Sequence, residues 1–210
     1  MNYYYKSESM KKLFLGTFTV LVFLTSTFAQ SGNDLLKKVQ DRYSSISSFS
    51  ADFIQYSGNR NKITGKFLYK KENNVKIETG ASTIVSNGKT NWNYNKKQNK
   101  VIITSYDDSD ASLFSFNKII FDFPSKSKVE QTKENNDDVL VITTNKNSDL
   151  NFAEAKLWVN DNNLITKIEI IEENNSLITI ELSDYKLNQD LTDSQFSFTP
   201  PEGSRILDLR

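Results

Sequence analysis

The strongest β-hairpin signal in the chain is the run Ile84-Val85-Ser86-Asn87-Gly88-Lys89-Thr90-Asn91-Trp92-Asn93-Tyr94. Asn-Gly is the dipeptide that tight hairpin turns prefer, because both residues tolerate a positive φ. Apolar side chains recur at every second position on either side of the turn, and this alternation places them on one face of a strand. The run therefore predicts two antiparallel strands joined by a tight turn at Asn87-Gly88.

The same period of two extends outward from this hairpin through the first half of the chain. It predicts six short strands, near residues 49–53, 63–69, 75–77, 83–85, 92–94 and 101–104. Their connections are too short to be crossovers, so we expect an antiparallel meander and exclude a parallel α/β sheet. Before the strands, residues 34–46 carry apolar side chains at helical spacing behind the capping residues Asn33 and Asp34. This segment predicts an amphipathic helix.

The second half of the chain predicts one apolar helix and five more strands. Residues 111–121 are denser in apolar side chains than an ordinary surface helix, and Pro124 is expected to end that helix. Asn- and Asp-rich turns then separate strands at about 127–133, 138–145, 153–160, 164–172 and 176–186. The predicted fold is thus α+β, mainly antiparallel β: an incomplete, half-open β-barrel of about eleven strands with a helical lid.

The inward face of such a sheet needs more cover than two short helices provide. The large side chains that we expect on this face are Phe53, Phe67, Trp92, Tyr94, Trp158, Ile168 and Ile170. An apolar cavity between them and the helices would bind an apolar ligand. Ordinary core packing accounts for the same pattern, and periodicity alone does not separate the two interpretations.

The N-terminus has the pattern of a secretory signal. Lys11 and Lys12 precede the apolar run 13–24, and Ala29 suits a cleavage position. The run is shorter than the ~20 residues of a membrane-spanning helix. We therefore expect residues 1–29 to be cleaved after Sec-dependent export, and residues 30–210 to form one domain.

The composition argues against several classes of function. The chain has no Cys to accept a lipid or form a disulfide, and no His to act as a general base or metal ligand. Its 26 basic and 26 acidic residues balance, which argues against nucleic-acid binding. We therefore expect a protein that is not an enzyme and that needs no metal or cofactor.

Three motifs resemble the periplasmic lipoprotein-carrier family, the LolA-like proteins. The first is the hairpin run itself, where the family has a Ser-Asp/Asn-Gly-Lys turn and a Trp-x-Tyr strand. The second is Phe196-Ser197-Phe198-Thr199-Pro200-Pro201-Glu202-Gly203, which is similar to the family's Phe-x-Phe-x-Pro-Pro-x-Gly ending. The third, looser motif is Phe53-Ile54-Gln55 followed by a Gly65-x-Phe67 strand. The order and spacing of the three span nearly the whole expected mature chain.

The resemblance implies a function as well as a fold. It implies a soluble, monomeric periplasmic carrier that takes acylated lipoproteins from an inner-membrane ABC transporter and delivers them to the outer membrane, where the acceptor stays unidentified. By position, the acyl chains would contact Val75, Ile77, Ile84, Trp92 and Tyr94 on the sheet and Leu113, Phe114 and Ile119 on the lid. Plain core packing of the same residues stays open.

One position departs from the family's pattern. The family has an Arg-Pro pair that helps to latch the lid, and the matching residues here are Lys71 and Glu72. Lys lacks the planar fork of Arg, so we expect a weaker latch at Lys71. An envelope sensor or assembly domain, which would bind lipids or envelope proteins on the same half-barrel without transport, is the alternative function.

Overall fold

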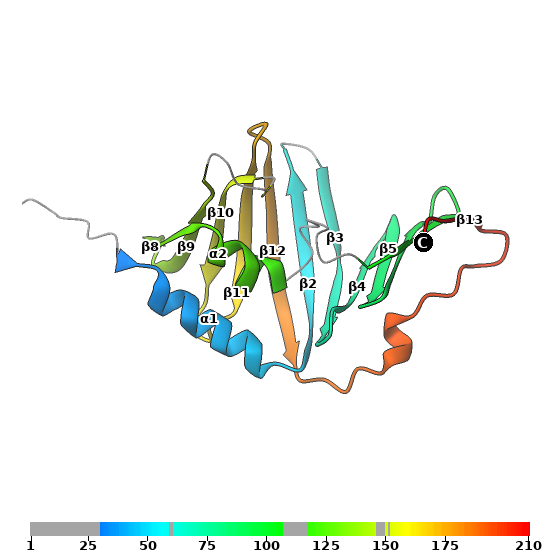
Figure 1. Ribbon diagram of the computed structural model, residues 1–210, viewed down its shortest axis with the longest axis horizontal. Coiled ribbons are helices and arrows are strands. Elements are labelled where there is room, and N and C mark those ends of the chain that lie inside the picture. The colour runs from blue at the N-terminus through cyan, green and yellow to red at the C-terminus, as the bar shows by residue number, and fades with distance from the viewer. Residues whose placement is uncertain (1–29, 59–60, 107–116, 146–149, 151) are drawn as a thin grey trace, which may run out of the picture.

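In the computed structural model, the described residues are 30–58, 61–106, 117–145, 150 and 152–210. Within them, thirteen strands form one sheet in the order β1-β8-β9-β10-β11-β12-β2-β3-β4-β5-β6-β7-β13 (Figure 1). The strands are β1 (Gln30–Ser31), β2 (Ser48–Ser57), β3 (Asn61–Lys70), β4 (Asn74–Thr79), β5 (Ser82–Asn87), β6 (Thr90–Asn95), β7 (Lys100–Ser105), β8 (Lys128–Glu134), β9 (Asp137–Thr143), β10 (Phe152–Val159), β11 (Ile165–Glu172), β12 (Leu177–Leu187) and β13 (Arg205–Asp208). The helical elements are α1 (Asn33–Ser45), the π-helical turn η1 (Lys118–Asp122), α2 (Phe123–Ser125) and the 3₁₀ turn η2 (Asp193–Phe196).

The predicted fold class is confirmed: the sheet is open, mainly antiparallel and accompanied by few helices. The eleven predicted strands correspond to β2 to β12, and the hairpin at Asn87-Gly88 joins β5 to β6 with Gly88 at φ 76°. Two strands were missed. β1 has only two residues, and β13 has four and is the one strand of the described sheet that pairs in parallel, with β7. Neither is long enough to show a periodicity.

Of the two helices predicted from the sequence, the first is confirmed and the second is only partly within the described residues. The predicted helix 34–46 is α1. Of the predicted helix 111–121, residues 111–116 lie outside the described residues. From Lys118 the chain is helical through Ser125, and Pro124 lies inside α2 instead of ending the helix. Pro124 has no N–H to donate to the carbonyl of Ile120, four residues earlier, and that carbonyl accepts from Gln40 Nε2 instead.

One face of the sheet packs against α1 and η1, and we call it the helix face. In Figure 1, α1 and α2 lie in front of the strands around β10 to β12. Leu35, Val39 and Tyr43 of α1 are buried, and the ring of Tyr43 meets Phe49 of β2 edge-on at 6.0 Å. Each such side chain contributes about 2 kcal/mol by leaving water. The apolar stripe that defined the helix in the sequence is therefore the surface that fixes α1 on the sheet.

The opposite face is covered at β4 to β7 by residues 188–204, and we call it the C-terminal face. Figure 1 shows this orange segment passing beyond β4 and β5, away from α1. Phe196 of η2 is fully buried, and Phe198 stacks on Tyr94 with ring centroids 5.4 Å apart. Thr192 begins η2 with a capping box, exchanging hydrogen bonds with Gln195. The sheet thus has two apolar cores, one on each face.

No helix among the described residues is long and apolar enough to cross a membrane.

Candidate functional site

The helix face of β4 and β5 forms an apolar floor. Ile77 and Ile84 are directly paired across these strands, and Val75 lies one step along β4 on the same face. Ile77 is buried, whereas Val75 and Ile84 are half-buried and pack against the rim of the main core. Three of the predicted lipid-binding residues therefore lie together, and two of them keep accessible surface that a ligand can cover.

The floor becomes polar at β6. Strand register places Asn93 beside Ile84 and Asn91 beside Ser86, all on the helix face. Asn93 is exposed and Asn91 is half-buried. The apolar part of the helix face therefore has a polar border, which suits a ligand with an apolar body and a polar head.

The segment η1 packs against the main core. Ile119 and Ile120 are buried there, and the ring of Phe123, the first residue of α2, packs at a tilt against Phe152 with centroids 5.0 Å apart. Phe121, by contrast, is 36% exposed. Ile119 is thus placed in the main core of the helix face. Leu113 and Phe114, the other predicted lid residues, lie outside the described residues.

The expectation that Trp92 and Tyr94 face inward with Ile77 is wrong. Trp92 pairs with Val85 and Tyr94 with Thr83, so all four lie on the C-terminal face. The sequence showed the alternation along β6 but not which parity meets the helices, because both faces of this strand border buried or half-buried groups. On this face Phe198 of the C-terminal segment packs against the ring of Tyr94, with ring centroids 5.4 Å apart.

The same expectation fails for Trp158. Its neighbours Leu157 and Val159 belong to the main core, while Trp158 pairs with Lys167 and carries the ammonium group of that lysine 3.8 Å above its ring. The ring therefore lies on the face opposite the helices, beside the buried Val139 and under the ammonium group of Lys167. Phe53, Phe67, Ile168 and Ile170 do lie in the main core, as expected.

A hydrogen-bond circuit fastens α1 to the sheet. The backbone N–H of Ile165 donates to Tyr43 Oη at 3.1 Å, and Tyr185 Oη donates to the carbonyl of Ile165 at 2.7 Å. The two hydroxyls lie 3.3 Å apart, and since Tyr185 already donates to Ile165, Tyr43 donates to Tyr185. Burial raises the pKa of Tyr43 to about 12 and that of Tyr185 well above its ordinary value. Both phenols therefore stay neutral at physiological pH.

Side-chain hydrogen bonds also hold η1 in place. Gln40 of α1 donates through Nε2 to the carbonyl of Ile120 at 3.0 Å. Tyr69 Oη donates to Asn117 Oδ1 at 3.2 Å, and Asn117 Nδ2 donates to Asn73 Oδ1 at 2.9 Å. These hydrogen bonds are part-buried, and each contributes about 1 kcal/mol. They add to the packing of the apolar side chains that holds the segment on the sheet.

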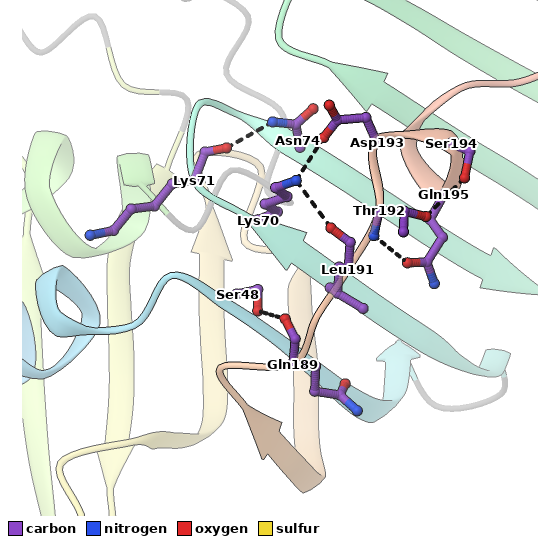
Figure 2. Close-up of polar contacts among 10 residues, drawn as sticks. All are labelled: Ser48, Lys70, Lys71, Asn74, Gln189, Leu191, Thr192, Asp193, Ser194 and Gln195. Atoms are coloured by element: carbon purple, nitrogen blue, oxygen red, sulfur yellow. Dashed lines mark hydrogen bonds and ion pairs between the residues drawn. The ribbon is translucent and has the colours of Figure 1, made fainter.

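Two consecutive lysines at the end of β3 reach to opposite sides (Figure 2). Lys70 Nζ bonds the carbonyl of Leu191 at 3.0 Å and the carboxylate of Asp193 at 2.6 Å, and so holds the C-terminal segment. Lys71, the predicted latch, points away from that segment and donates to the carbonyl of Ser44 in the last turn of α1 at 2.8 Å. Lys71 thus bonds α1. Of the lid predicted at 111–121, residues 111–116 lie outside the described residues, so the predicted latch between Lys71 and the lid stays a prediction. A cation at a helix C-terminus is favourable because the last carbonyls lack partners.

The sequence alone does not predict the roles of Tyr43, Tyr185 and Lys70. Tyr43 lies within the apolar stripe of the predicted helix 34–46, and a buried tyrosine needs a partner for its hydroxyl. That need is the one signal that pointed to the circuit. The partners of Tyr43 and Lys70 lie more than 100 residues away in the sequence, and no local pattern identifies them.

The described residues contain no group of three or more acidic side chains arranged to hold a metal ion. What the helix face offers is apolar surface with a polar border, closed on one side by a short helix and a helical turn. An open, mainly antiparallel sheet of this kind, with helices on one face, is a half-barrel.

Comparison with known proteins agrees with this class. The family model "Outer membrane lipoprotein carrier protein LolA" matches residues 44–199. An uncharacterized protein of Methanocaldococcus jannaschii is 27% identical over 99% of this chain, which spans 61% of that protein's length. An outer-membrane lipoprotein carrier protein of Francisella tularensis subsp. novicida is 25% identical, with 95% of this chain and 98% of that protein covered.

A solved structure has the same fold. An uncharacterized conserved protein from Thermus thermophilus aligns with a TM-score of 0.57 at 14% identity, over 85% of this chain and 99% of that one. With the family model covering most of the sheet, the chain belongs to the outer membrane lipoprotein carrier (LolA) family.

Proposed function

We propose that the protein is a periplasmic carrier that shelters the acyl chains of lipoproteins on its helix face and moves them from the inner to the outer membrane. The observation that carries the proposal is the half-buried apolar floor of Val75 and Ile84, which borders the main core in a chain of the lipoprotein-carrier family. The proposal treats the protein as a monomeric binding protein and not as an enzyme.

The free energy of transfer supports an apolar floor of this size. Each methylene group removed from water contributes ~0.8 kcal/mol, so covering about eight carbons of one acyl chain contributes ~6 kcal/mol. This is enough to keep a lipoprotein in solution, and small enough for an acceptor to compete for the chain. The polar border at Asn91 and Asn93 would face the glycerol and peptide part of the same ligand.

The route of the cargo follows from the sequence signal and the family. Residues 1–29 would direct export and be cleaved, leaving the carrier soluble in the periplasm. An inner-membrane ABC transporter would supply the lipoproteins, and an acceptor at the outer membrane would receive them. The names of the carrier proteins in Francisella support this assignment.

Binding of a purified triacylated lipoprotein by the exported protein tests the proposal. We expect Val75→Asp and Ile84→Asp each to weaken binding at least tenfold, because a buried carboxylate would replace apolar contact with the acyl chain. Leu177→Asp is the matched control: Leu177 is 44% exposed and lies on the opposite face, beside Ile171.

Circular dichroism and urea unfolding establish that each variant is folded. Equal binding by folded Val75→Asp, Ile84→Asp and native protein would refute the assignment of the acyl chain to this floor. Failure of the native protein to bind any acylated cargo would refute the carrier function and leave an envelope sensor.

A further inference from the structure

The edge strand β13 exposes an unusual amount of apolar surface. Ile206 is 54% exposed, Leu207 41% and Leu209, just beyond the strand, 60%. Half of the large apolar side chains with comparable exposure in the described residues lie in these four positions, 206–209. Figure 1 places β13 at one edge of the sheet, on the far side from α1. Strands β6 and β7 separate these exposed residues from the floor on β4 and β5 that we assign to the cargo.

These three side chains point to both sides of the sheet. Ile206 pairs with Val101 and lies on the C-terminal face, whereas Leu207 pairs with Ile102 and lies on the helix face. The backbone N–H of Leu209 continues the parallel pairing by donating to the carbonyl of Ile103 at 2.9 Å, so Leu209 shares the face of Leu207. A partner that covers one face of the sheet would leave at least one of the three in water. All three would be covered if the edge of the sheet were inserted into the surface layer of a membrane.

Cations lie at the end of this edge where β7 and β13 begin. The turn before β7 reads Asn95-Lys96-Lys97-Gln98-Asn99-Lys100, with three lysines and no acidic residue. Lys100 pairs directly with Arg205, and Asn99 holds the start of β13 by accepting from the backbone N–H of Arg205 at 2.8 Å. The carboxylate of Asp208 is occupied by Arg210, whose Nη2 lies 2.6 Å from it. The exposed apolar side chains are thus bordered by positive charge.

We propose that β13 and the turn 96–100 form a docking surface for an anionic membrane, which receives the edge of the sheet at headgroup depth. Ile206, Leu207 and Leu209 would enter the boundary between headgroups and acyl chains, and Lys97, Lys100 and Arg205 would contact anionic headgroups. The backbone groups on the free side of β13 require water, so the edge stays within the hydrated headgroup layer and does not reach the hydrocarbon. This surface is separate from the cargo floor, and its function is to bring the protein to a membrane.

Co-sedimentation of the exported protein with vesicles tests the proposal. The vesicles contain phosphatidylcholine with a quarter phosphatidylglycerol, or phosphatidylcholine alone. We expect binding to the anionic vesicles that falls as salt rises, and at least tenfold weaker partitioning of the variant I206S/L207S/L209S. The variant K97Q/K100Q/R205Q should lose the preference for phosphatidylglycerol. I63S/L177S is the matched control, because Ile63 and Leu177 are 42% and 44% exposed on other strands.

Three results would overturn the proposal. Native protein that stays in the supernatant with both vesicle types would do so, and so would equal losses in I206S/L207S/L209S and I63S/L177S. A native dimer on size-exclusion chromatography that I206S/L207S/L209S converts to monomer would assign the edge to a second copy of the chain instead. Leu209→Ser alone is the safeguard against misfolding, since this side chain is the most exposed of the three, and it should weaken partitioning about threefold. Cargo binding should be unchanged in all of these variants.

Discussion

A single bulged residue changes which side chains of β12 lie on the helix face. Asp184 adopts a positive φ of 53° in β12, where the pairing with β2 shifts register between Ser183 and Lys186. The extra residue of this bulge reverses the alternation, so that Tyr185 lies on the helix face and its ring packs 5.5 Å from Phe49. Without the bulge, the hydroxyl circuit that fastens α1 would lose one of its two phenols.

Gly65 is a position in the middle of β3 at which the surrounding structure leaves no room for a side chain. A Cβ there would overlap the carbonyl oxygen of Glu78 and lie 2.7 Å from the ring of Phe53, whereas a Cβ on Gly80 would meet nothing within 4 Å. We expect Gly65→Ala to lower the free energy of unfolding by about 1–3 kcal/mol, as overpacking of a core does, and Gly80→Ala to change it by less than about 0.5 kcal/mol. Urea unfolding of the two variants measures the difference. Equal stability of the pair would contradict the packing described for β3.

The buried phenols predict how stability depends on pH. Unfolded tyrosine loses its proton near pH 10, whereas folded Tyr43 holds it to about pH 12. Between these values the unfolded chain binds fewer protons, so the free energy of unfolding falls as pH rises, by about 3 kcal/mol for a shift of two pKa units. The stabilisation is complete below pH 10 and is lost as pH rises through the pKa of the folded state.

Urea unfolding at pH 8, 10 and 11 checks this dependence. Lysines titrate in the same range, so the control is Tyr43→Phe/Tyr185→Phe, which keeps every lysine. We expect this variant to be less stable at pH 8 and to lose less stability on going to pH 11. A slope as steep as that of the native protein would show that the two phenols are not the cause.

Among the elements, the positions of the strands were predictable from the sequence, but the face of the sheet on which their side chains lie was not. All strands from β2 to β12 were predicted from alternation and turn residues, and seven of the nine non-glycine residues with positive φ are asparagines in such turns. Alternation does not say which parity meets the helices. On β2 the buried parity faces α1, whereas on β6 the parity of Trp92 faces the C-terminal segment. That segment has no periodicity of its own, so its position was not predictable.

The variant Trp92→Ala tests whether the C-terminal face contributes to stability without contributing to cargo binding. Because Trp92 is half-buried on the C-terminal face, we expect Trp92→Ala to lower the free energy of unfolding by about 2 kcal/mol, less than the 3–5 kcal/mol typical of a fully buried ring. Binding of acylated lipoprotein should stay within twofold of the native value, unlike that of Ile84→Asp. Fluorescence-detected urea unfolding and a pull-down of the lipoprotein provide the two measurements. A tenfold loss of binding in the folded Trp92→Ala variant would return this residue to the cargo site.

In the whole molecule, one sheet supports two cores with different attachments. The helix face holds α1 and η1 through the tyrosine circuit, Gln40 and Lys71, and the C-terminal face holds residues 188–204 through Lys70 and Phe196. The sequence predicted the open antiparallel sheet and the apolar residues at Val75, Ile77 and Ile84. It did not predict the long-range polar contacts, because their partners are set by the assembled sheet and not by neighbours in the chain.

Release of lipoproteins from spheroplasts tests the carrier function most directly. Spheroplasts are incubated with the purified exported protein, and lipoproteins in the soluble fraction are detected by immunoblot. We predict that the native protein and Leu177→Asp bring lipoproteins into solution, each as a complex with the carrier, and that Ile84→Asp leaves them on the membrane. Lipoproteins that stay on the membrane with the native protein, or that are released equally by Ile84→Asp, would contradict the function proposed for the helix face.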